Sequence, residues 1–169
     1  MTREGKRTHW DNHLSSVVRP LSSLIEPGRV HRDVYTDPEI FELEMERIFG
    51  RAWLYVGHAS QVSAPGDFIT TELGRQPVIM VRHRDGTIHV LLNRCTHRGA
   101  KVINERKGNA PRLTCCYHGW SFDTDGRLAG VPVPEGRAAD FDRARSVLRT
   151  RRALRSTAVS CSRALPKTA

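Results

Sequence analysis

The sequence predicts a mainly β protein, a small antiparallel β-sandwich or barrel with one helix before it. Short β-rich runs separated by turn signals occupy residues 53–133 of the 169-residue chain. Two Asp-Gly pairs, Asp85-Gly86 and Asp125-Gly126, each lie between such runs and are typical of β-hairpin turns. The segment before residue 51 has helical rather than alternating spacing, so the β pattern begins only after it.

The predicted helix covers residues 36–50. Thr36 and Glu39 have the spacing of a capping box, and Gly50 is a natural helix end. The apolar residues at helical spacing are Ile40, Phe41, Met45, Ile48 and Phe49. We expect this stripe to pack against the domain that follows. Residues 1–35 are polar and interrupted by prolines, so we predict an irregular arm there.

The following domain is predicted to span residues 51–142. Its strand-like runs are residues 53–56, 68–71, 78–81, 88–92, 120–122 and 127–129. His58, His83 and His89 fall on or beside these runs. None of the three has a Cys or carboxylate partner at ligand spacing, so we interpret them as ordinary surface or core residues.

Positive charge is concentrated at the C-terminal end. The chain has 27 Lys and Arg against 18 Asp and Glu, a net charge of +9. Eight basic residues and no acidic residue lie in residues 143–169, which leaves a net charge of +1 for residues 1–142. We therefore predict a disordered Arg-rich tail and not a nucleic-acid-binding domain. The sequence shows no apolar run of membrane-helix length and no signal-peptide core, so we expect a cytoplasmic protein without membrane contact.

Two short motifs carry the chemistry: Cys-Thr-His at residues 95–97 and Cys-Cys-Tyr-His at residues 115–118, with 17 residues between them. Each motif offers one thiolate and one imidazole. Residues two apart in an extended loop point to the same side, so Cys95 and His97 can face one metal centre. A single zinc ion is one candidate. The mixture of Cys and His within each motif favours a two-iron cluster, in which one iron takes both Cys and the other both His.

Electrostatics predict the redox character of such a cluster. Two ferric ions and two sulfides carry a formal charge of plus two, which two thiolates cancel and neutral imidazoles leave unchanged. A cluster with four Cys ligands would stand at minus two, so it accepts an electron less readily. His-for-Cys replacement accordingly raises the potential to roughly −150 to +300 mV, against about −400 mV for plant-type ferredoxins.

About residues 34–142 resemble the Rieske [2Fe–2S] domain of the α subunits of aromatic ring-hydroxylating dioxygenases. The resemblance rests on NRCTHRGAKV and LTCCYHGWSFDTDGRLAGVP, and extends upstream through YTDPEIFELEMERIFGRAWLYVGH, PGDF and RDGTIHVLLNRC. It implies a Rieske-type [2Fe–2S] cluster whose ligands are Cys95, His97, Cys115 and His118. Nearby, Arg98 and Tyr117 are either hydrogen-bond donors close to the cluster or loop-packing residues.

Several positions indicate which kind of Rieske centre this is. Cys116 stands where the family usually has Pro, and we interpret it as a small, buried side chain that binds no metal. Ala100 and Tyr117 stand where respiratory Rieske proteins have a disulfide. Trp120 stands where those proteins have a Ser that raises the potential. The sequence is therefore similar to the low-potential oxygenase type, with Trp120 and Phe122 interpreted as core residues.

The resemblance implies an electron-transfer module that accepts electrons from a ferredoxin or reductase. In the family the acceptor is a mononuclear Fe(II) site in a second domain, which works with other oxygenase subunits. We expect that this chain lacks that domain because its reading frame was interrupted near Arg143, and whether the chain alone is an oxidoreductase is left open. The alternatives are a free-standing Rieske ferredoxin, a zinc-stabilised basic protein that binds nucleic acid, and a truncated product without function.

Overall fold

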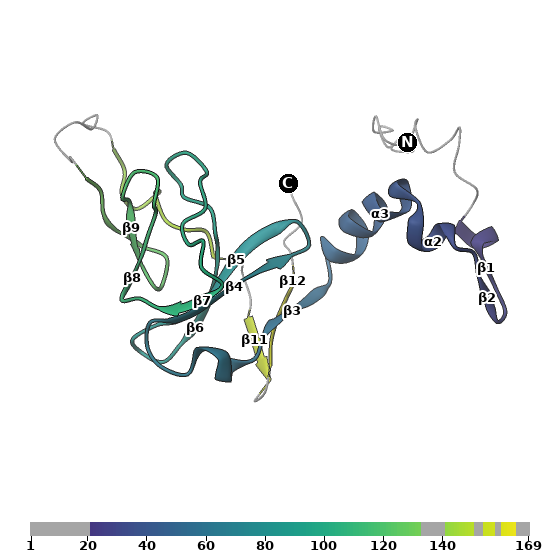
Figure 1. Cartoon of the computed structure of the whole chain (residues 1–169), viewed down its shortest axis with the longest axis horizontal. Coiled ribbons are helices and arrows are strands. Elements are labelled where there is room, and N and C mark those ends of the chain that lie inside the picture. The colour runs from purple at the N-terminus through teal and green to yellow at the C-terminus, as the bar shows by residue number, and fades with distance from the viewer. Residues whose placement is uncertain (1–20, 133–140, 151–153, 158–159, 165–169) are drawn as a thin grey trace, which may run out of the picture. The chain divides into compact units, whose positions relative to one another are not determined.

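The structure of the chain is a computed structural model (Figure 1). It describes residues 21–132, 141–150, 154–157 and 160–164. The chain divides into two compact units, residues 1–43 and residues 44–169. Among the helices of the described ranges, none is both long enough and apolar enough to cross a membrane.

The first unit contains short helices and one small hairpin. Its elements are η1 (Leu21–Leu24), β1 (Ile25–Glu26), β2 (Arg29–Val30), α2 (Asp33–Thr36) and α3 (Pro38–Glu44), which ends one residue past the unit boundary. The strands β1 and β2 pair antiparallel. Leu24 and Ile40 are the buried apolar residues described in this unit.

The predicted helix over residues 36–50 is divided and begins differently from the prediction. Thr36 is the last residue of α2, and its hydroxyl donates to the carbonyl of Arg32. The side chain of Asp37 caps α3 instead, because its Oδ1 accepts the backbone N–H of Glu39 at 2.8 Å. After α3 the chain forms a π-helical turn, η2 (Met45–Phe49), and Gly50 follows it as predicted.

A four-stranded antiparallel sheet organises the second unit. Its strands are β4 (Asp67–Leu73), β5 (Gln76–Arg82), β6 (Ile88–Leu92) and β7 (Lys107–Asn109), in the order β6-β5-β4-β7. Successive residues of β5 enter different apolar clusters: Ile79 and Val81 lie in one, and Val78 and Met80 in the other. Because both faces of β5 are buried at residues 78–81, the sequence there is continuously apolar and does not alternate.

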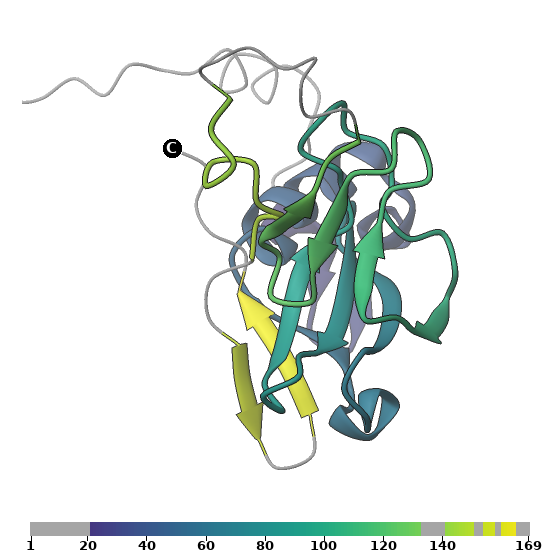
Figure 2. The ribbon, with the colours of Figure 1, turned by 90° about the vertical axis from the view of Figure 1, so that its left-hand side faces the viewer.

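Two three-stranded antiparallel sheets complete the described part of the second unit, whose strands are drawn in Figure 2. One has the order β10-β9-β8 and contains β8 (Arg112–Thr114), β9 (Ser121–Asp123) and β10 (Leu128–Gly130). The other has the order β11-β12-β3 and contains β3 (Trp53–Gly57), β11 (Leu154–Thr157) and β12 (Ser160–Ala164). A short helical turn, η3 (Ala59–Val62), connects β3 to β4. The predicted mainly β, antiparallel fold with a short helix before it is confirmed.

Both Asp-Gly hairpins form as predicted, one between β5 and β6 and the other between β9 and β10. The backbone N–H of Gly86 donates to the carbonyl of His83 at 3.0 Å, and that of Gly126 donates to Asp123 at 2.8 Å. The φ angles of the two glycines are +87° and +94°. This left-handed conformation favours glycine, which explains why a local two-residue signal was sufficient to predict both turns.

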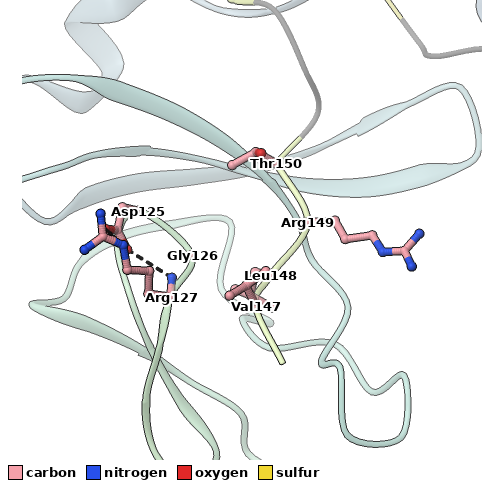
Figure 3. Close-up of a pocket in the computed structure, with 7 residues that line it drawn as sticks. All are labelled: Asp125, Gly126, Arg127, Val147, Leu148, Arg149 and Thr150. Atoms are coloured by element: carbon pink, nitrogen blue, oxygen red, sulfur yellow. Dashed lines mark hydrogen bonds and ion pairs between the residues drawn. The ribbon is translucent and has the colours of Figure 1, made fainter. Parts of the chain in front are cut away.

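Residues 141–150 differ from the prediction that the domain ends at Asp142 and that a disordered tail follows. Leu148 is only 1% exposed and belongs to the larger apolar cluster of the second unit. Its backbone N–H donates to the carbonyl of Gly126 at 2.8 Å. A Cβ at Gly126 would lie 2.8 Å from the Leu148 carbonyl oxygen, so glycine permits this close approach. Figure 3 shows residues 147–150 beside the Asp125–Arg127 turn, with which they line an open hollow.

The described parts of the chain beyond residue 153 are strands. β12 pairs antiparallel with both β11 and β3, and Cys161 lies opposite Gly57 in the register with β3. Figure 2 shows this hairpin, in yellow, at the C-terminal end of the chain. The high Arg content of the tail predicted disorder, but backbone pairing with an edge strand does not depend on apolar side chains.

We expect Leu148→Ala to lower the free energy of unfolding by about 2–5 kcal/mol, because it leaves a cavity in a packed core. Urea denaturation followed by circular dichroism measures the change. Arg145→Ala is the matched control, since the Arg145 side chain is 90% exposed and its removal should leave the midpoint almost unchanged. Equal midpoints for the two variants would show that residues 143–150 do not pack on the domain.

Candidate metal centre

Two loops of the second unit carry the four predicted metal-binding residues. The first loop lies between β6 and β7 and contains Cys95 and His97. The second loop connects β8 to β9 and contains Cys115 and His118. Because β6 and β8 belong to different sheets, the arrangement of the two sheets brings the loops together.

The two loops are closed by equivalent backbone hydrogen bonds. In the first loop, the N–H of Gly99 donates to the carbonyl of Cys95 at 2.9 Å, and the N–H of Cys95 donates to Ala100 at 2.8 Å. In the second loop, the N–H of Gly119 donates to the carbonyl of Cys115 at 2.9 Å, and the N–H of Cys115 donates to the carbonyl of Trp120 at 2.8 Å. Each glycine follows its Cys by four residues and has a positive φ, +77° and +67° respectively. The sequence therefore places Cys and Gly at the same spacing in both loops because both form the same turn.

The two cysteines lie side by side in the interior. Cys95 is 3% exposed and Cys115 is 2% exposed, and the two thiols are neighbours. The Sγ of Cys115 donates to the carbonyl of Lys101 at 4.0 Å. Burial raises the pKa of the Cys95 thiol, and the neighbouring Cys115 raises it further. The backbone N–H groups of His97 and Arg98 hydrogen-bond to Cys95 and lower the pKa of its thiol. These N–H groups would also stabilise a thiolate at Cys95, because they donate to its sulfur.

The two histidines form a second pair, closer to solvent. The ring centroids of His97 and His118 are 4.8 Å apart, with 72° between the ring planes. His97 is half-buried and its Nδ1 atom is fully buried, whereas His118 is exposed. The ring of Tyr117 lies 3.8 Å from that of His118, and Tyr117 itself is 59% exposed. The structure therefore brings together thiol with thiol and imidazole with imidazole.

This paired arrangement fits a centre with two metal ions. A [2Fe–2S] cluster of the mixed-ligand type takes two Cys on one iron and two His on the other. Within the part of the chain that the structure describes, no three Cys, His, Asp or Glu side chains gather closely enough to hold a metal ion. The donor chemistry, the two pairs and the N–H groups at Cys95 therefore suit a cluster that shares its ligands between two irons.

Asn93 is a supporting residue that the sequence analysis did not identify. It is 2% exposed, and its Oδ1 accepts the backbone N–H groups of Val102 and Ile103 at 2.9 and 3.0 Å. Its Nδ2 donates to the carbonyl of Ile103 at 2.7 Å. A single amide side chain thus ties both ends of the first loop together. The signal in the sequence was a polar residue directly after the apolar run of β6, because a polar side chain that is buried there needs hydrogen-bond partners.

Cys116 differs from its sequence interpretation as a buried residue. It is exposed, and its Sγ accepts a hydrogen bond from Nδ2 of Asn104 at 3.4 Å. Arg98 is exposed as well, so its contact with the cysteine pair is made by its backbone and not by its guanidinium. Neither exposed side chain joins the buried thiol pair.

The three histidines on or beside the predicted strands, His58, His83 and His89, each have a hydroxyl partner. Nδ1 of His58 lies 2.6 Å from the Ser60 hydroxyl, and Nδ1 of the buried His83 lies 2.6 Å from that of Thr124. Nε2 of His89 lies 2.9 Å from the hydroxyl of Thr87. Burial lowers the pKa of His89, with His83 as a smaller cause of the same sign. These contacts agree with the interpretation of all three as structural residues.

The part of the chain that contains both Cys and His motifs is similar to known proteins. Residues 52–150 match the family described as Rieske [2Fe-2S] domain. The chain is 48% identical over 128 residues to chlorobenzene dioxygenase subunit alpha from Cupriavidus sp. (strain PS12), which covers 75% of this chain and 27% of that subunit. Naphthalene 1,2-dioxygenase from Rhodococcus sp., solved with indole bound, gives a TM-score of 0.79 at 31% identity over 86% of this chain and 33% of its own.

A second solved structure has a different named substrate. The quaternary ammonium Rieske monooxygenase CntA, in complex with L-carnitine, gives a TM-score of 0.73 at 29% identity over 82% of this chain and 39% of its own. The family match ends at residue 150 and so includes the segment of Leu148 that the sequence-based boundary excluded. The chain spans about a quarter of the length of the chlorobenzene dioxygenase subunit that it matches. The chain belongs to the Rieske [2Fe–2S] domain family, which implies a [2Fe–2S] cluster, and it matches the N-terminal part of aromatic ring-hydroxylating dioxygenase alpha subunits.

Proposed function

We propose that the second unit is the electron-transfer module of a ring-hydroxylating oxygenase, and that Cys95, His97, Cys115 and His118 hold its cluster. The pairing of thiol with thiol and imidazole with imidazole carries this proposal. When bound, a cluster of this type accepts and releases one electron. The electron donor would be a ferredoxin or reductase. The acceptor would be a mononuclear Fe(II) site in a part of the oxygenase that this chain does not span, assembled with other subunits.

The two pairs would hold the cluster in different ways. Cys95 and Cys115 would bind as thiolates in the interior, where the N–H groups of His97 and Arg98 compensate part of the buried charge. The histidines would bind as neutral imidazoles. For His97 we assign Nδ1 as the metal-binding atom, because it is the buried nitrogen of a half-buried ring. The proposal includes a cytoplasmic location, since thiolate ligands persist in a reducing compartment.

A basic surface next to the first loop supports an acidic protein as the electron donor. Between residues 94 and 112 every Lys and Arg side chain is exposed, and Glu105 is the only acidic residue in that stretch. The basic residues are Arg94, Arg98, Lys101, Arg106, Lys107 and Arg112. Arg112 forms an ion pair with Asp123 at 3.3 Å. The remaining positive charge would attract an acidic carrier and raise its association rate.

Similarity to several oxygenases favours this function over a free-standing ferredoxin. The alpha subunit of chlorobenzene dioxygenase aligns over three quarters of this chain, including part of the sequence outside residues 52–150. By this resemblance we infer that the oxygenase acts on an aromatic substrate. The domain itself does not select that substrate, because naphthalene 1,2-dioxygenase and the carnitine-binding CntA share its fold.

The ligand assignment can be tested with one substitution at a predicted ligand and one at a neighbouring residue that binds no metal. Reconstituted wild-type protein should contain iron and acid-labile sulfide in equal amounts. His97→Cys should retain a cluster but lower its reduction potential, because a thiolate adds negative charge. Voltammetry measures the midpoint. Cys116→Pro, which changes a residue beside a ligand, should leave both the visible absorption bands and the midpoint unaltered. Zinc without sulfide in the wild type, or an unshifted midpoint in His97→Cys, would contradict the assignment.

Charge reversal tests the basic surface. We expect Arg98→Glu and Lys101→Glu to slow electron transfer from an acidic ferredoxin at low ionic strength, and the difference from wild type to shrink as salt is added. Stopped-flow absorbance measures the rate, and the midpoint of each variant corrects for any change in driving force. Arg84→Glu is the control, because Arg84 is exposed on the β5–β6 turn outside this stretch. A rate that falls equally in all three variants would reject the surface as a docking site.

A further inference from the structure

We propose that Trp120 is a positioning residue for His97: its indole fixes the plane of the imidazole and, as a buried aromatic ring, lowers the reduction potential of the cluster. This inference rests on the proposed function, since it takes His97 as a ligand. Trp120 was interpreted from the sequence as a core residue only. The structure adds a specific contact with one of the four predicted ligands.

The contact is a parallel stack between the two loops. The ring centroids of Trp120 and His97 are 4.8 Å apart, and their planes differ by only 6°. Trp120 belongs to the second loop, where its carbonyl closes the turn at Cys115, whereas His97 belongs to the first loop. The stack therefore joins one loop to a ligand of the other. The ring of His118 also lies beside this imidazole, with a centroid distance of 4.8 Å and an angle of 72°, so two rings restrict the His97 side chain.

Trp120 is itself held in place. It is 3% exposed, and the ring of Phe141 meets it edge-on at a centroid distance of 5.6 Å and an angle of 78°. Phe122 lies 6.5 Å away on the adjoining strand β9. An indole packed on several sides cannot follow the imidazole if that ring turns. The plane of the indole thus acts as a fixed reference for the plane of His97.

Two effects of the indole have the same sign on the potential. Reduction adds one negative charge to the cluster, and exclusion of water by a buried aromatic ring disfavours the added charge. The face of an aromatic ring carries negative electrostatic potential. The indole that covers the His97 imidazole therefore also disfavours negative charge added to the cluster on the other side of that imidazole. Replacement of the indole by a smaller, non-aromatic group should therefore raise the midpoint.

The experiment compares Trp120→Leu and Trp120→Phe with Phe68→Leu. Phe68 is 5% exposed in the same apolar cluster, so its truncation loosens the core without removing the stack on His97. In the metal-free proteins, nuclear magnetic resonance reports the ring-current shift of the His97 ring protons. In the reconstituted proteins, voltammetry gives the midpoint, and electron paramagnetic resonance of the reduced state reports the symmetry of the cluster environment.

We expect Trp120→Leu to abolish the ring-current shift, to raise the midpoint and to change the resonance positions. Trp120→Phe should restore part of each effect, and Phe68→Leu should leave all three near wild type. Unchanged midpoint and resonance in Trp120→Leu, or equal shifts in Phe68→Leu, would overturn the positioning role. If Trp120→Leu does not fold, Trp120→Phe decides the question, since it must give intermediate values. Wild-type protein that binds no iron–sulfur cluster would instead reject the proposed function.

Discussion

The burial of the neighbouring thiols of Cys95 and Cys115 is the constraint around which the rest of the site is arranged. Both side chains are buried, so ionisation of either would place a charge in the apolar core. Burial raises the pKa of Cys95 for this reason, and the metal-free protein holds that thiol protonated at neutral pH. Positive charge from bound metal would favour the thiolate, and binding would release protons. The same burial that protects the thiols therefore couples their ionisation to metal binding.

The apolar cluster that surrounds the thiols also stabilises the fold. Cys95, Cys115, Trp120 and Leu148 all belong to it, although they come from three separate segments of the chain. Across β5 lies a second cluster that contains none of the four, because alternate side chains of that strand point to opposite faces. A change beside the thiols or Trp120 in the first cluster can reach the candidate site, whereas the second cluster contains none of these residues. Stability and site geometry are thus linked on one face of the central sheet.

Short sequence patterns predicted the turns and strands, because interactions between neighbouring residues determine these features. Each Asp-Gly pair formed its turn because glycine at positive φ decides the backbone there, and the mainly β fold followed from short apolar runs. The Cys and His motifs indicated the residues that the structure brings together as one pair of thiols and one pair of imidazoles. The partners of Asn93, the stack of Trp120 on His97 and the burial of Leu148 could not be predicted. The stack and the burial of Leu148 are contacts between segments distant in sequence, and the partners of Asn93 lie nine and ten residues further along the loop. The surrounding arginines concealed Leu148 within a stretch of high charge.

The two candidate histidine ligands are not equivalent, and the difference follows from their loops. In the first loop His97 follows its Cys by two residues, and its ring lies half-buried against Trp120. In the second loop the spacing is three residues, and His118 is exposed beside Tyr117. A protein surface that approaches this end of the domain therefore meets His118 and Tyr117 before it can reach His97. One imidazole thus lies at the surface, while the other lies where the core can hold its orientation.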